Sequence, residues 1–194
     1  MTRKKKLTLV ALVIVAIGVI AQLMKRPFPS DRTPEGAYLR IAKGLSEDHP
    51  EVAFPYLETE AQWACITLRD ARKKTLDRAL ASYPETQRVE LEHAYGEDAR
   101  ATGGDFVFVR IARERGWIAR LRRDLSGVAR VEVEGERASV VTARGTRYAF
   151  RRRDNGIWGM TMFTADLEAE AQKASRDLEV VTAAAADFDR AKNR

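Results

Sequence analysis

The chain has 194 residues, a formal charge of +6 and one cysteine, which excludes a disulfide scaffold and a metal site built from cysteines. Its 45% apolar and 32% charged residues are typical of an ordered globular domain. The six excess positive charges all lie in residues 1–26, so residues 27–194 carry equal numbers of basic and acidic side chains. The charge therefore does not indicate a nucleic-acid-binding domain, and we expect no nucleic-acid partner.

Residues 7–24 form an apolar run without a charged residue, LTLVALVIVAIGVIAQLM. As an α-helix this run would be roughly 27 Å long, close to the ~30 Å hydrocarbon core of a bilayer. We predict a membrane anchor over residues 1–26, with residues 7–24 in the bilayer. The alternative is a cleaved signal peptide, because Val19-Ile20-Ala21 resembles a cleavage site. The length of the run and the Lys25-Arg26 pair after it favour the uncleaved anchor.

The basic residues around the apolar run predict how the chain is oriented. Four basic residues at 3–6 precede the run, and Lys25, Arg26 and Arg32 follow it. The positive-inside rule then favours a cytoplasmic N-terminus and an extracytoplasmic soluble domain in a single-pass membrane protein. If the segment is cleaved, the domain is instead periplasmic or secreted.

Helices are predicted for the first part of the soluble domain, which we expect to be a single α+β domain over residues 33–194 after a short linker at 27–32. Thr33 precedes Pro34 as the N-cap of the first helix. Further helix signals are a capping box of Thr59 and Gln62, a helix from Thr86 to Tyr95 closed by Gly96, and a helix that ends before Gly127. The run FVFVRIA at 106–112 fits a strand or a buried helix, and we favour the helix.

Beyond Gly127 the apolar period changes from near four to two, and turn residues recur at Gly135-Glu136, Arg144-Gly145 and Asn155-Gly156. This pattern predicts a four-strand antiparallel meander over about 128–163. A long C-terminal helix is predicted over about 165–191, with Thr164 as its cap.

Apolar residues recur along the predicted C-terminal helix at alternating steps of four and three. They are Leu167, Ala171, Ala174, Leu178, Val181, Ala185 and Phe188. Such a seam suits either packing inside the chain or a homodimer through this helix, and its three alanines favour packing inside the chain.

The sequence contains no pattern that predicts catalysis, a metal or a cofactor. His49 and His93 stand apart without a zinc-binding motif, and there is no nucleophile elbow and no glycine-rich phosphate loop. Cys65 lies in an apolar stretch without a paired histidine motif, which favours packing over reactivity. We therefore predict no catalytic residue, and an enzyme is the less favoured interpretation.

A basic patch is the best candidate for a binding site. Arg147, Arg151, Arg152 and Arg153 stand beside aromatic residues that include Trp158, and arginines among aromatics can hold anionic groups. An anionic envelope polymer, a lipid headgroup or a protein would be the partner. The alternative is that these arginines pair with carboxylates of the same domain, which the neutral charge of residues 27–194 favours.

The order of elements, helices and then a meander that includes RYAFRRRDNGIWGMTMF, resembles the NTF2-like (cystatin-like) superfamily and membrane-anchored bacterial envelope proteins. The resemblance covers about residues 33–163 and implies a pocket between helices and sheet, but no catalytic residue. We expect a membrane-anchored envelope domain that serves as a non-catalytic binding or accessory module. The alternatives are an enzyme with an NTF2-like pocket and an assembly protein that dimerises through the C-terminal helix.

Overall fold

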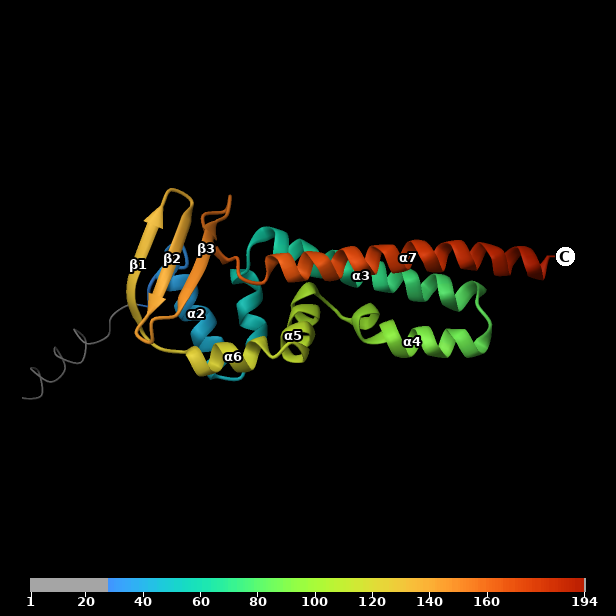
Figure 1. Ribbon diagram of the computed structural model, residues 1–194, viewed down its shortest axis with the longest axis horizontal. Coiled ribbons are helices and arrows are strands. Elements are labelled where there is room, and N and C mark those ends of the chain that lie inside the picture. Colours follow the sequence, from blue (N-terminus) through green and yellow to red (C-terminus); the bar gives the residue numbers. More distant parts are fainter. Residues whose placement is uncertain (1–27, 194) are drawn as a thin grey trace, which may run out of the picture.

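The computed structural model describes residues 28–193, which fold into a broad head and a long helical rod (Figure 1). The head contains α2 (Pro34–Ser46), the 3-10 helix η1 (Pro50–Tyr56), α5 (Gly104–Glu114), α6 (Trp117–Asp124) and a sheet. The rod contains α3 (Thr59–Ser82), α4 (Glu85–Arg100) and α7 (Thr164–Lys192). The predicted α+β class and the long C-terminal helix are confirmed.

The sheet is the predicted meander. Its strands β1 (Val128–Glu134), β2 (Arg137–Thr142), β3 (Arg147–Arg152) and β4 (Trp158–Met160) are antiparallel and lie in sequence order. Gly135, Gly145 and Gly156 have positive φ angles in the turns between the strands, a conformation that glycine adopts without strain. The turn residues thus fix the register, which places alternate side chains on the buried face.

The buried face of the sheet packs against α2. Thr33 caps this helix as predicted, because its Oγ1 accepts a hydrogen bond of 3.1 Å from the Gly36 N–H. Aromatic and aliphatic side chains then fill the space between helix and sheet. The residues concerned, all nearly or completely buried, are Tyr38, Ile41, Val140, Tyr148, Phe150 and Met160. These side chains form the part of the core that joins α2 to the sheet.

The described part of the predicted linker, residues 28–32, lies against the domain. The Pro29 carbonyl accepts from Arg40, whose guanidinium also lies 4.9 Å from the centre of the Phe28 ring. The Trp158 indole donates to the Arg32 carbonyl at 3.1 Å. Hydrogen bonds to α2 and β4 thus hold this segment in place.

The helices α3 and α7 run side by side and in the same direction along the rod (Figure 1). Three contacts along their length join residues 105 to 107 positions apart: Glu58 with Thr164, Arg72 with Asp177, and Ser82 with Asp189. A constant offset of about 106 residues is what parallel helices in one register give. The predicted seam of α7 is therefore packed inside the chain, on α3.

The part of α3 that faces this seam is built mostly from small and polar residues. Seven buried residues repeat along it at steps of four and three, and Leu68 is the one large apolar residue among them: Ala61, Cys65, Leu68, Arg72, Thr75, Ala79 and Ser82. The large apolar residues Trp63 and Leu80 of the same helix are exposed. Small side chains on both helices allow α3 and α7 to approach closely.

Three other local predictions need correction. Gln62 does not complete a capping box, because its amide donates to the Leu57 carbonyl at 2.9 Å. Thr164 is the first residue of α7 and donates to Glu58 rather than capping the helix. Gly96 does not end α4, which continues to Arg100, and it is the buried residue of that helix.

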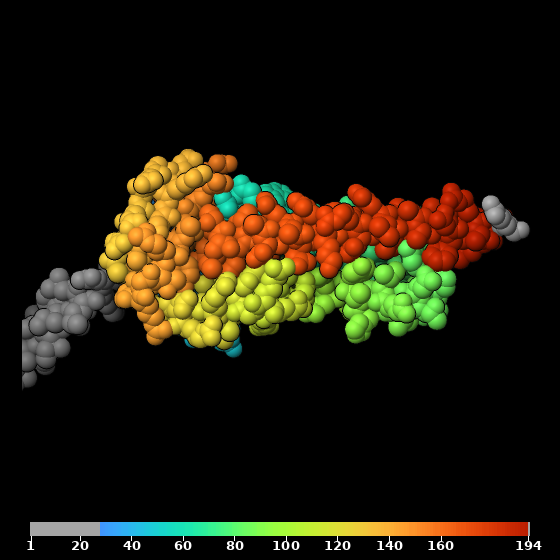
Figure 2. Space-filling model, in the orientation of Figure 1, coloured from blue at the N-terminus to red at the C-terminus, as the bar shows by residue number. Residues whose placement is uncertain are grey.

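The run at 106–112 is helical, as favoured, and forms most of α5. Figure 2 shows α7 along one edge of the molecule, with α5 and α4 following one another along the opposite edge. Within residues 28–193 no helix is both long and apolar enough to span a bilayer. The predicted anchor at residues 7–24 lies outside the described residues.

Candidate functional site

The predicted basic patch lies on and beside β3, and three of its arginines make contacts inside the molecule. Arg147 pairs with Glu132 at 2.7 Å, and Arg151 pairs with the buried Glu58 at 2.8 Å. Arg153 donates to the Thr59 hydroxyl at 3.1 Å and to the Pro55 carbonyl at 2.9 Å. These contacts correspond to the internal pairing that the sequence left open as the alternative.

The other two predicted residues do not share one surface. Trp158 is only 4% exposed and packs in the head core, so its indole cannot stack on a ligand. Arg152 is exposed at the end of β3, where its backbone N–H donates to the Glu136 carbonyl at 2.7 Å. The strands thus bring Arg147 and Arg151 to one face, without the aromatic residue that would complete a stacking site.

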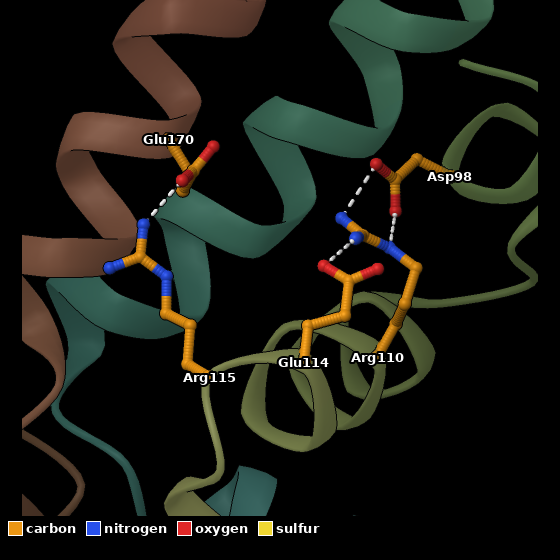
Figure 3. A network of polar contacts seen from close by, with 5 residues as sticks. All are labelled: Asp98, Arg110, Glu114, Arg115 and Glu170. Carbon is orange, nitrogen blue, oxygen red and sulfur yellow. Dashed lines mark hydrogen bonds and ion pairs between the residues drawn. The ribbon is translucent and has the colours of Figure 1, made fainter. Parts of the chain in front are cut away.

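A second polar cluster lies where α4 meets α5 (Figure 3). The Arg110 guanidinium donates to both carboxylate oxygens of Asp98, with 2.7 Å between Nη2 and Oδ2, and to Glu114 at 2.6 Å. Burial raises the pKa of Asp98 above its usual value, although the contacts with Arg110 act in the opposite direction. Nearby, Arg115 joins the end of α5 to Glu170 of α7 (Figure 3).

An open pocket of about 700 Å³ lies beside this cluster, lined by Asp98, Arg110, Glu114, the exposed Phe106 and other residues of α4 and α5. A carboxyl group with a raised pKa beside a pocket is a candidate general acid. Here both oxygens of Asp98 accept from one guanidinium, and the lining contains a single hydroxyl, Thr102, and no thiol. The arrangement is that of a helix-to-helix ion pair, so it supports packing better than catalysis.

The cysteine and the histidines do not form a reactive or metal-binding site in the described chain. Cys65 is buried in α3, and burial raises the pKa of its thiol to about 12. His49 lies 3.0 Å from Glu51, whereas His93 is exposed on α4. Within residues 28–193 no three potential ligands come close enough to hold a metal ion. Cys65 therefore serves the packing of α3, as predicted from its apolar surroundings.

A groove of about 620 Å³ lies between α3 and α7, and we call it the α3/α7 groove. Ala64, Ala171 and Ser175 contribute small side chains to its lining. Trp63 stands at its edge and is 62% exposed. An exposed tryptophan beside a groove of small residues has the character of a contact point for another protein.

The sequence does contain a pattern from which the exposure of Trp63 could have been predicted, although the residues of that pattern are not all hydrophobic. Ala61, Cys65 and Leu68 repeat at the spacing of a helix seam, which places Trp63 to one side of the seam. Recognition of that seam would have predicted an exposed Trp63.

Comparison of the chain with protein-family models, with curated proteins and with solved structures finds no match, so the NTF2-like resemblance stays a prediction and the geometry described above is the basis for any functional conclusion.

Proposed function

We propose that the protein is a single-pass, membrane-anchored envelope module that binds a protein partner through its helical rod and has no catalytic role. The observation that carries this proposal is the α3/α7 groove, which is lined by the exposed Trp63. Three arginines of the predicted basic patch and the cluster at Asp98 make contacts inside the chain. Trp is among the residues that contribute most to protein–protein binding.

The position of Phe28, the first described residue, supports an anchored rod. Phe28 lies against α2 in the head, whereas α7 ends at the opposite end of the molecule (Figure 1). If residues 7–24 span a bilayer, the head lies next to the membrane and the rod extends from it. A 29-residue helix such as α7 is about 43 Å long, enough to present the groove to a partner beyond the membrane surface.

The location is tested with the full chain fused at its C-terminus to alkaline phosphatase, which is active only outside the cytoplasm. In a bacterial host we expect an active fusion in the membrane fraction, resistant to alkaline carbonate extraction. An inactive fusion, or a full-length chain in the soluble fraction, would contradict the anchored envelope location.

The binding surface is tested by photo-crosslinking in the same cells. A benzophenone amino acid replaces Thr67, which lines the groove, or Val89, which is exposed on α4 away from it. We expect discrete crosslinked products from position 67 and none from position 89. Equal products from both positions, or none from position 67, would contradict a partner in the groove.

A further inference from the structure

The two charges that α7 contributes to the α3/α7 groove are arranged symmetrically about one residue, whereas Glu60 of α3 lies near Arg151. Glu168 lies four residues before Gln172, and Arg176 lies four residues after it; all three line the groove. Four residues correspond to about 6 Å along a helix, so the two charges stand at equal distances on either side of Gln172. The opposite charges can therefore meet across a two-fold axis.

Neither charge is used inside the described chain. Within residues 28–193 the ion pairs of α7 involve Asp166, Glu170, Asp177, Asp187, Asp189 and Arg190. Glu168 and Arg176 therefore remain available to a group outside the chain. A partner that satisfies both must carry a positive charge opposite Glu168 and a negative charge opposite Arg176.

Trp63 fits the same symmetry. With the offset of about 106 residues between α3 and α7, Gln172 stands level with Ile66, three residues beyond Trp63 along the rod. A two-fold axis at Gln172 carries Trp63 of one copy to the level of Ser175 and Arg176 of the other. A guanidinium over an indole ring is a favourable cation–π contact, stronger when it is removed from water.

We infer that a second copy of this chain occupies the α3/α7 groove, packed antiparallel about Gln172, so that Trp63 and Glu168 of each copy meet Arg176 of the other. Such an isologous contact closes on itself as a dimer. A parallel second copy would place Glu168 against Glu168 and is disfavoured. The seam that starts at Leu167 does not form this interface, because α3 covers it.

This inference rests on the part of the proposed function that assigns binding to the groove, and not on the membrane anchor. Its first test is disulfide crosslinking of the full chain in membranes. Gln172→Cys lies on the proposed axis, whereas Lys173→Cys, the matched control, is exposed about 100° further around the same helix. Cys65 stays in both variants because it is buried with a pKa near 12.

On mild oxidation we expect Gln172→Cys to yield at least ten times more covalent dimer than Lys173→Cys. Equal yields from the two variants, or no dimer from Gln172→Cys, would overturn the antiparallel arrangement.

The second test is a charge exchange, measured by light scattering of the full chain in detergent micelles. Glu168→Arg and Arg176→Glu each place like charges opposite one another at two positions of the dimer, so each should raise the dissociation constant at least tenfold. The double variant restores opposite charges and should return the dissociation constant to within about threefold of the original value. A monomeric wild type, or a double variant no better than the singles, would overturn the inference.

The outcomes separate this inference from the proposed function. A photoproduct from position 67 with twice the mass of the chain supports both. A photoproduct of another mass, together with a monomeric chain in light scattering, leaves the binding groove standing and overturns the second copy as its occupant. No photoproduct and no dimer contradict both.

Discussion

Tyr38 and Tyr148 are neighbouring buried tyrosines that differ in one hydrogen bond. The centres of their rings lie 5.4 Å apart, between α2 and the sheet. The Tyr38 hydroxyl donates to the Ser126 carbonyl at 2.9 Å, whereas the Tyr148 hydroxyl has no partner among the described residues. Burial raises the pKa of Tyr148 to about 12, because the charged phenolate would be removed from water.

Removal of each hydroxyl should therefore have different effects on stability. We expect Tyr38→Phe to lower the free energy of unfolding by about 1 kcal/mol, because it removes a satisfied hydrogen bond and leaves the Ser126 carbonyl unpaired. Tyr148→Phe should change it by less than about 0.5 kcal/mol, or raise it, because no bond is lost. Urea unfolding of both variants checks this, and equal losses would show that Tyr148 has a partner.

Asp98 and Glu132 should affect stability with opposite dependence on pH. The pKa of Asp98 is raised by burial, so the folded state favours its protonated form and its contribution to stability is lost as the pH rises above about 4. The pKa of Glu132 is lowered by hydrogen bonds from Arg147 and Arg130. Ionised Glu132 therefore stabilises the folded state above about pH 4, and this stabilisation is lost on acidification.

Urea unfolding between pH 3 and 7 tests the two signs. The stability of Asp98→Asn relative to the wild type should rise with pH, whereas that of Glu132→Gln should fall. A relative stability of Asp98→Asn that falls with pH would mean that Arg110 outweighs the burial of the carboxylate.

At the scale of elements, the sequence predicted those features that depend on a few neighbouring residues, namely turns and helix ends. The turns at Gly135, Gly145 and Gly156 fixed the meander, and the Thr33 N-cap fixed the start of α2, because each depends on a few consecutive residues. The partner surface of α3 could not be read in the same way. Its seam is made mostly of small and polar residues, which are buried by α7, about 106 positions away in the sequence.

The close approach of α3 and α7 predicts a strict limit on side-chain size. Ala79 and Ala185 are both fully buried in the paired seams. Ala185→Leu should lower the free energy of unfolding by about 2 kcal/mol, because the added atoms force the helices apart. Ala183→Leu, on the exposed side of α7, should change it by less than about 0.5 kcal/mol. Equal effects in denaturant unfolding would contradict a tightly packed seam.

For the whole molecule, the charge pattern of the sequence could not show which arginines are paired. The sequence indicated the arginines around β3 and left internal pairing open. In the fold, Glu58 pairs with Arg151 from 93 positions away, and Glu132 pairs with Arg147 from the neighbouring part of the sheet. Trp63 belongs to no motif that predicts a binding site, and its exposure follows from the packing of α3 on α7.

The central claim is that Trp63 contacts a binding partner and does not stabilise the fold. The variant Trp63→Ala tests this claim most directly. In cells that carry the photo-crosslinker at Thr67, this change should reduce crosslinking at least tenfold. The free energy of unfolding should stay within about 0.5 kcal/mol of the wild-type value, as expected for an exposed side chain. Unchanged crosslinking, or a loss of stability above about 2 kcal/mol, would show that Trp63 is not a partner contact.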